Sequence, residues 1–229
     1  MLIFFDIDAT LITTGGVGIK AMVDAGRELF GPQFAVEGIP FAGRLDPLIL
    51  ADMLSKNGVE VSEAHLAAMR ATYGKHLPRH LAAGTGRSLP GVLPLLADLH
   101  AREGVTLGLL TGNFAETGLL KLRACGIPTE KFTICVWGDE SPHRPPARDH
   151  LPGVGIERYG RRFSRPISGE RVVIIGDTPH DISCAKAHGC RSLGVGTGSF
   201  SVDQLRQAGA DHAVPDLSDT ETIVRWLLP

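Results

Sequence analysis

Three nearly continuous apolar runs restrict what this chain can fold into more than any other feature of its sequence. They occupy residues 2–5, 105–110 and 172–175. Unbroken rather than alternating apolar residues are typical of strands that are buried on both faces of a parallel sheet. Helical patterns separate these runs, and further strands are predicted at residues 132–137, 191–195 and 213–214. The sequence therefore predicts an α/β fold with helices on both faces of an open parallel sheet.

A long segment, residues 15–88, interrupts this alternation. It is rich in alanine and leucine and carries no strand pattern of comparable strength. Helices are predicted at residues 17–30, from Asp46 to about Gly58, and from Ser62 toward Tyr73, with Pro78 breaking any continuation of the third. We interpret the segment as a helical insertion that covers a core domain made of residues 1–14 and 89–229.

Capping signals place the starts of two helices in the core. Asn113 followed by Glu116 is typical of a capping box, and Thr178 and Asp181 are predicted at the N-cap and N3 positions of a later helix. The proline and glycines of residues 151–155 are expected to break a helix instead.

Composition excludes several classes of partner. The formal net charge is -2 and charged residues make up 21% of the chain, so no basic field exists to hold nucleic acid or an anionic membrane. No stretch approaches the roughly 20 apolar residues that span a bilayer. The first residues lack the basic region of a signal peptide, and the four cysteines form no CxxC pair. A cytoplasmic protein with reduced thiols, monomeric or homodimeric, is expected.

Polar residues follow each of the three apolar runs. Asp6 and Asp8 follow the first run, Thr111 follows the second, and Asp177 and Asp181 follow the third. Ligands of open parallel sheets bind at the carboxyl ends of the strands, so these side chains are expected to meet. Carboxylates brought together in this way repel one another unless a cation is present, and oxygen ligands suit Mg²⁺. Asp6 and Asp177 are the predicted side-chain ligands, and Asp8 the third ligand through its backbone carbonyl.

Phosphoryl transfer is a chemistry that suits this set. Asp6 is predicted to attack phosphorus as the nucleophile, and Asp8 to act as general acid and then as general base. Thr111 and the backbone N–H groups of Gly112 and Asn113 are predicted to bind phosphate oxygens at a helix start. Each element also has a plain structural interpretation, because strand-end aspartates and Thr-Gly-Asn segments often form only turns or caps.

Taken together, these residues resemble the motifs of the haloacid dehalogenase superfamily. Its DxDxT motif is matched by Asp6-Ile7-Asp8-Ala9-Thr10, and its GDxxxD motif by residues 176–181. The motif of a strand that ends in threonine is matched by Leu109-Leu110-Thr111. The resemblance implies a Rossmann-like core, a helical cap that closes over small substrates, and roles for Thr10 in substrate binding and Asp181 in catalysis. Asp8 indicates the phosphatase or phosphotransferase branch, because the dehalogenases lack a carboxylate there.

The sequence departs from the family pattern at two positions. Ala9 stands where the family usually has glycine, and alanine is strained there if the backbone is left-handed. The family's motif lysine is also missing, since no lysine lies between Lys131 and Lys186. Arg144 is predicted to take the place of this lysine, and Arg148 is the second candidate. The structural alternative is that Arg144 is only a solvated arginine in a loop.

The insertion contributes one further candidate. Residues 41–46, Phe-Ala-Gly-Arg-Leu-Asp, resemble the substrate-specificity loop of capped members. Gly43 would allow close approach and Arg44 would meet an anionic substrate group, whereas the plain interpretation is a surface loop that leads into a helix.

The resulting expectation is a magnesium-dependent phosphatase, similar to phosphoglycolate phosphatases, that acts on a small phosphorylated metabolite through an aspartyl-phosphate on Asp6. A phosphosugar mutase would use the same residues and return the phosphoryl group to its substrate. A non-catalytic phosphate-binding protein is the third possibility, motivated by Ala9 and the missing lysine.

Overall fold

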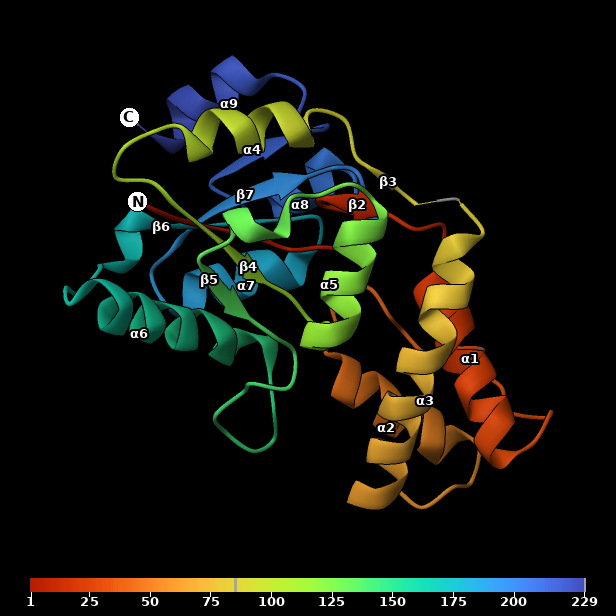
Figure 1. Ribbon diagram of the computed structural model, residues 1–229. Helices are drawn as coiled ribbons and strands as arrows, with labels where there is room; N and C mark the ends of the chain where they lie inside the picture. The colour runs from red at the N-terminus through yellow and green to blue at the C-terminus, as the bar shows by residue number, and fades with distance from the viewer. Residues whose placement is uncertain (85, 229) are drawn as a thin grey trace.

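The computed structural model describes residues 1–84 and 86–228 and contains a central sheet of six parallel strands (Figure 1). Their order across the sheet is β5-β4-β1-β6-β7-β8. The strands are β1 (Leu2–Phe5), β4 (Thr106–Leu110), β5 (Ile134–Val136), β6 (Val172–Gly176), β7 (Arg191–Val195) and β8 (His212–Val214). All six strands predicted from the sequence are therefore present, and the α/β fold class is confirmed.

The register of the three central strands brings their carboxyl ends to one level. Phe5 of β1 lies opposite Leu109 of β4 and Ile175 of β6. Asp6 continues the ladder, because its N–H donates to the carbonyl oxygen of Ile175 at 2.9 Å. Thr111 and Asp177 follow two residues after Leu109 and Ile175, so the polar residues after the three strands meet at one edge of the sheet.

Helices cover both faces of the sheet, which explains the unbroken apolar runs. Ile3 and Phe5 pack into a buried cluster with α4 (Val92–His100), α5 (Ala115–Ala124) and α9 (Thr220–Leu227). Leu2 and Phe4 point to the opposite face and pack with α6 (Leu151–Phe163) and α7 (Pro179–Ala187). Because successive strand residues alternate between the faces, both sets must be apolar. A short helix, α8 (Val202–Gln207), packs beside β8.

Three helices of the insertion form a group beside the sheet, next to α5 (Figure 1). They are α1 (Val17–Phe30), α2 (Asp46–Lys56) and α3 (Glu63–Ala82). Their buried side chains share one cluster, which also contains Phe114 at the start of α5. A two-stranded antiparallel pair, β2 (Ile12–Thr13) and β3 (Arg87–Ser88), joins the segments on either side of the insertion. The exact division into two domains remains a prediction.

Two helices extend through positions where breaks were predicted. Helix α3 continues past Pro78 to Ala82 because the turn beyond it is held by tertiary contacts: His80 Nε2 lies 2.8 Å from Asp24 on α1, and Leu81 packs on the apolar cluster. Helix α6 includes residues 151–155, with its proline in the first turn, where no N–H is needed. Packing requires a glycine at position 155, since a Cβ there would lie 2.4 Å from the Phe4 ring.

The predicted capping box is present at the start of α7, whereas the structure shows none at the start of α5 among the described residues. Thr178 and Asp181 form the predicted capping box of α7, with reciprocal side-chain and backbone hydrogen bonds. The box predicted at Asn113 is absent from the described hydrogen bonds of α5, whose N-cap position is Phe114. Asn113 instead turns its amide toward other side chains, and the N–H of Phe114 donates to Asp46 Oδ2 at 3.2 Å.

No helix in residues 1–84 and 86–228 has the length and apolar character that a membrane span requires.

Candidate active site

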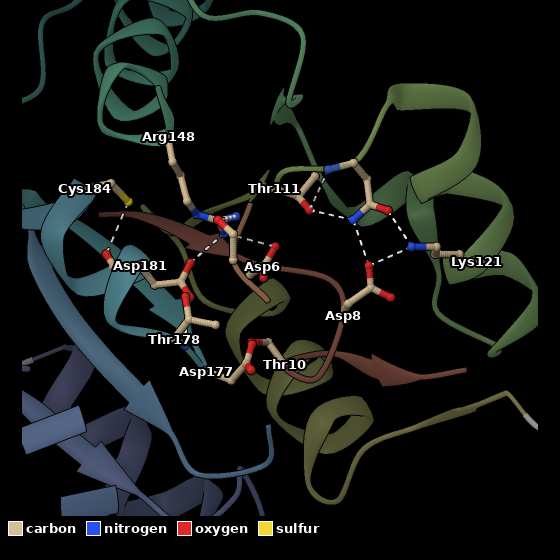
Figure 2. A network of polar contacts seen from close by, with 12 residues as sticks. Asp6, Asp8, Thr10, Thr111, Lys121, Arg148, Asp177, Thr178, Asp181 and Cys184 are labelled. Carbon is tan, nitrogen blue, oxygen red and sulfur yellow. Dashed lines mark hydrogen bonds and ion pairs between the residues drawn. The ribbon is translucent and has the colours of Figure 1, made fainter. Parts of the chain in front are cut away.

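A cavity of about 400 Å³ lies at the carboxyl edge of the sheet, between the strand ends and the helical insertion. It brings together most of the predicted site residues: Asp6, Asp8, Gly43, Arg44, Thr111, Gly112, Asn113 and Asp177 all line it. Figure 2 shows two groups of polar contacts there, one around Arg148 and Asp6 and the other around Asp8 and Lys121. The predicted meeting of the residues that follow the carboxyl ends of the strands is therefore present.

Asp6 occupies the centre of the arrangement (Figure 2) and is 5% exposed. Its Oδ1 lies 3.2 Å from Arg148 Nη2. Burial raises the pKa of Asp6 to about 6 against the opposing effect of Arg148, because a charged carboxylate loses its hydration in this position. Arg148 thus favours the charged form of this carboxylate.

A buried acidic cluster surrounds Asp6. Oxygens of Asp6, Asp177 and Asp181 all lie within 4.8 Å of one another. Burial, followed by repulsion from Asp181 and Asp6, raises the pKa of Asp177 to about 8. Thr10 Oγ1 donates to Asp177 Oδ1 at 3.1 Å, so Thr10 orients this carboxylate and does not line the cavity.

The acidic cluster fits a divalent cation. All of its donors are carboxylate oxygens, which hard cations prefer. Burial first, and then repulsion within the cluster, raises the pKa of Asp6 and of Asp177, and a bound cation would oppose both effects. Space is kept beside Asp177, since a Cβ on Gly198 would lie 1.9 Å from its Oδ2. Asp181 already accepts hydrogen bonds from Arg148 and Thr178, which leaves Asp6 and Asp177 as the better ligands.

Arg148, not Arg144, is the cation that contacts the acidic cluster. Arg148 is 6% exposed, and its Nη2 lies 2.6 Å from Asp181 Oδ1. Burial opposes its charge, but Asp181 and Asp6 raise the pKa of Arg148 above its usual value. The prediction for Arg144 is wrong because that residue is exposed, in a proline-rich loop outside the cavity. Arg148 opens the short 3-10 turn η2 (Arg148–His150), which packs against α7 and so directs the side chain inward.

Asp8 is held by two donors on its Oδ2 (Figure 2). Lys121 Nζ lies 2.8 Å away and Asn113 Nδ2 lies 2.9 Å away. Burial opposes the charge of Asp8, but Lys121 and Asn113 outweigh it, so the pKa of Asp8 lies below its ordinary value. The side chain is still 44% exposed, and Asp8 lines the cavity.

Lys121 is a site residue that the sequence reasoning missed. It is 5% exposed in the middle of α5 and donates to Asn113 Oδ1 at 2.6 Å as well as to Asp8. Burial disfavours its charge, but Asp8 raises the pKa of Lys121 above its usual value. The one available signal is the helical spacing, because Lys121 falls on the buried face that carries Thr117, Gly118 and Leu122. A lysine on such a face needs a buried partner.

The predicted phosphate-binding segment is already engaged in internal hydrogen bonds. Thr111 is fully buried, and its Oγ1 accepts from the N–H of Asn113 at 3.4 Å and from Asn113 Nδ2 at 2.9 Å. The carbonyl of Gly112 accepts from the N–H of Asp46 at 2.7 Å. A Cβ on Gly112 would lie 2.0 Å from the carbonyl oxygen of Arg44, so this glycine lets the insertion approach the strand end.

Gly43 and Arg44 both line the cavity, and each contacts another residue of the protein. Gly43 has a φ of 69° and its carbonyl accepts from Arg148 Nη1 at 3.2 Å. Its close approach is to α7, since a Cβ on it would lie 2.6 Å from Thr178 Oγ1. Arg44 Nη1 lies 2.5 Å from Asp52 Oδ2 on α2, so its charge is paired within the insertion.

Ala9 adopts the left-handed backbone that was suspected from the sequence, with a φ of 57°. The conformation costs about 1–2 kcal/mol for a residue with a Cβ. Two hydrogen bonds hold it, from the Ala9 N–H to the Ile12 carbonyl at 2.8 Å and from Thr197 Oγ1 to the Ala9 carbonyl at 2.5 Å.

The sequence pattern of one known family matches most of the chain. The family of haloacid dehalogenase-like hydrolases matches residues 3–186, which span the acidic cluster, Asp8 and Arg148. This chain is a haloacid dehalogenase-like hydrolase.

Relatives and solved structures agree with this family. The chain is 26% identical over 233 residues to "Probable phosphatase IndB" of Dickeya dadantii, which covers 99% of this chain and 94% of the relative. It is 28% identical over 216 residues to the phosphoglycolate phosphatase of Escherichia coli O157:H7, covering 83% and 79% respectively. The structure of CbbY from Rhodobacter sphaeroides in complex with phosphate matches 95% of both chains with a TM-score of 0.75 at 21% identity, which supports the haloacid dehalogenase-like fold.

Proposed function

We propose that this hydrolase is a Mg²⁺-dependent phosphatase that removes phosphate from a small metabolite through an aspartyl-phosphate on Asp6. The observation that carries the proposal is the position of Asp6, between Arg148 and the other carboxylates of the acidic cluster in a cavity of about 400 Å³. The size suits a small ligand. The names of the relatives, a probable phosphatase and a phosphoglycolate phosphatase, support the same reaction class.

In the first step, an oxygen of Asp6 attacks phosphorus, and the bond between phosphorus and the ester oxygen breaks. Arg148 binds Asp6 Oδ1 and so leaves Oδ2 for the attack. Lys121 and Asn113 hold Oδ2 of Asp8 and keep the resting carboxylate ionised, so the proton for the leaving oxygen comes from the monoanionic form of the phosphate ester. Asp8 accepts this proton on Oδ1 and passes it to the leaving oxygen as the ester bond breaks.

In the second step, a water molecule attacks the phosphorus of the aspartyl-phosphate and Asp8 takes the proton of that water. The bond between phosphorus and Asp6 breaks, phosphate leaves and the carboxylate of Asp6 is restored. A Mg²⁺ ion held by Asp6, Asp177 and the backbone carbonyl of Asp8 would neutralise charge on the transferring phosphoryl group. Arg148 takes the part predicted for a motif lysine, which weakens the case for a non-catalytic phosphate-binding protein.

Phosphate release from a generic aryl phosphate tests this proposal, with Mg²⁺, with EDTA, and with the Asp6→Asn variant. Release that needs metal and is lost in Asp6→Asn supports it, provided that circular dichroism shows the variant folded. Release that persists in Asp6→Asn would contradict the nucleophile. Return of the phosphoryl group to a phosphosugar, seen in product analysis, would favour the mutase alternative. A cytoplasmic location and a monomeric or homodimeric state remain predictions from the sequence.

A further inference from the structure

The cavity contains a second polar region, which lies between the helical insertion and α5 and is distinct from the acidic cluster. Asp46 of α2 and Lys121 of α5 both line the cavity, and each residue is 5% exposed. Burial raises the pKa of Asp46 to about 7, and Lys121 is the charge that opposes this effect most strongly, so the two side chains lie close to one another. The proposed Mg²⁺ would be bound elsewhere, because Asp46 is not a member of the acidic cluster.

Asp46 keeps one carboxylate oxygen without a partner. Its Oδ2 accepts a hydrogen bond from the Phe114 N–H at 3.2 Å, whereas its Oδ1 has no hydrogen-bond partner among the described residues. The described side-chain atoms that are both enclosed and unpaired belong to Tyr73 and Arg148, so Oδ1 of Asp46 is reachable from the cavity. A carboxylate oxygen of a buried residue is costly to leave unpaired, so it needs a donor from water or from a ligand.

Lys121 keeps one N–H group for a ligand in the same region. An ammonium group has three donors, and two of those on Lys121 Nζ are used by Asp8 Oδ2 at 2.8 Å and Asn113 Oδ1 at 2.6 Å. Gly18 of α1 leaves this nitrogen accessible, since a Cβ on Gly18 would lie 3.2 Å from Lys121 Nζ. An acceptor beside the free oxygen of Asp46 can therefore bind Lys121 as well.

One free acceptor and one free donor together suit a hydroxyl group, which donates one hydrogen bond and accepts others. An ammonium group at this position would lie beside the charge of Lys121, and a carboxylate would lie beside Asp46. The hydroxyl lies close to the ester oxygen, because Lys121 contacts Asp8, which is proposed to pass the proton to that oxygen. The carbon chain would pack on apolar residues that line the same cavity, namely Ile19, Met22 and Ile49.

Building on the proposed phosphatase activity, we propose that the substrate is a phosphomonoester of a polyol or sugar, with a hydroxyl group that donates to Asp46 Oδ1 and accepts from Lys121 Nζ. The hydrogen bonds from the Asp46 N–H to the Gly112 carbonyl and from the Phe114 N–H to Asp46 Oδ2 hold the start of α2 at this subsite. Asp46 is then a specificity-determining residue, which contacts the leaving group and takes no part in the proton transfer.

Glycerol 3-phosphate and 2,3-difluoropropyl phosphate test the inference with the full-length enzyme and Mg²⁺. Fluorine is close to a hydroxyl group in size but cannot donate a hydrogen bond. Because fluorine withdraws electrons more strongly, the difluoro alcohol is the better leaving group, and slower turnover of its ester reports recognition rather than chemistry. We expect kcat/KM to favour glycerol 3-phosphate by about tenfold or more, as for a hydrogen bond to a charged group.

Replacement of Asp46 by asparagine separates recognition from structure. The amide oxygen of Asp46→Asn can still accept from the Phe114 N–H, which leaves the NH₂ group, a donor, in place of the acceptor Oδ1. The preference for glycerol 3-phosphate should therefore fall to within about twofold, in a variant that circular dichroism shows to be folded. Ile49→Val on the same helix is the control: it should change kcat/KM for both substrates by the same factor and leave their ratio at the wild-type value.

Two results would overturn the inference while the phosphatase activity stands. One is equal or faster turnover of the difluoro ester, or no turnover of either ester by an enzyme that hydrolyses aryl phosphates. The other is a preference that Asp46→Asn leaves unchanged. If no ester, aryl or alkyl, releases phosphate in the presence of Mg²⁺, the proposed function fails and this inference fails with it.

Discussion

Replacement of Arg148 by methionine should destabilise the protein more than any change at an exposed arginine. Methionine keeps much of the side-chain length but removes the charge that lies 2.6 Å from Asp181 and 3.2 Å from Asp6. The side chains of the pair with Asp181 are 5% and 2% exposed, so water does not replace the lost partner. Removal of one member of a buried ion pair costs about 3–5 kcal/mol.

We expect the free energy of unfolding of Arg148→Met to fall by about this amount, measured by urea denaturation in EDTA near neutral pH. Because three buried carboxylates then face one another without a cation, Mg²⁺ should restore part of the loss. Phosphatase activity should fall by about 100-fold or more, since Arg148 also binds Asp6, the proposed nucleophile.

Arg144→Met is the matched control. Arg144 lies four residues earlier on an exposed loop, so its replacement should change stability by less than about 0.5 kcal/mol and leave activity near the wild-type level. If Arg148→Met unfolds at the same urea concentration as the wild type, or if the two variants lose equal stability, the role assigned to Arg148 from the buried geometry is wrong.

Three further predictions concern the acidic cluster, the buried lysine and one helical glycine. In EDTA, the free energy of unfolding should rise as pH falls from about 8 to about 5. Burial raises the pKa of Asp177 to about 8 and that of Asp6 to about 6 in the folded protein, so the folded protein binds these protons at a higher pH than the unfolded chain does. Mg²⁺ should flatten this profile in urea titrations across the pH range, and a flat metal-free profile would contradict it. Lys121→Met should lower kcat by about tenfold or more, because it frees Asp8, the proposed acid–base carboxylate. Exposed Arg123→Met is the control in steady-state assays, and equal kcat values in the two variants would exclude a positioning role for Lys121. Gly155→Ala should cost about 1–3 kcal/mol in urea unfolding because the new Cβ meets the Phe4 ring, whereas Gly160→Ala on the same helix, with its nearest atom at 3.8 Å, should be neutral or stabilising.

The arrangement of the sheet was predictable because its signals are local. Each strand is an apolar run whose neighbours in sequence already show that both faces are buried. Parallel strands place their carboxyl ends at one edge, so the meeting of Asp6, Thr111 and Asp177 follows from the fold class. The start of α7 at Thr178 was equally readable, since a capping box is made by residues three positions apart.

The points at which helices end were less predictable, because the helix propensity of single residues contributes less free energy than tertiary packing does. Pro78 and the glycines of α6 carry unfavourable propensities, yet α3 and α6 continue through them. Asn113 has the right spacing for a cap but binds Asp8 and Thr111 instead. In each case contacts from another part of the chain outweigh the local preference.

The electrostatic detail of the site depends on contacts between distant segments. Lys121 and Asp8 are 113 positions apart, and Arg148 and Asp181 are 33 positions apart. Sequence alone established the α/β sheet, the acidic residues at its edge and the interval in which a cation was needed. Folding selected Arg148 over Arg144, because only the turn that packs on α7 directs an arginine inward. Folding also buried Lys121 against Asp8, since a lysine remains charged in an apolar interior only where the packed chain brings a carboxylate to it.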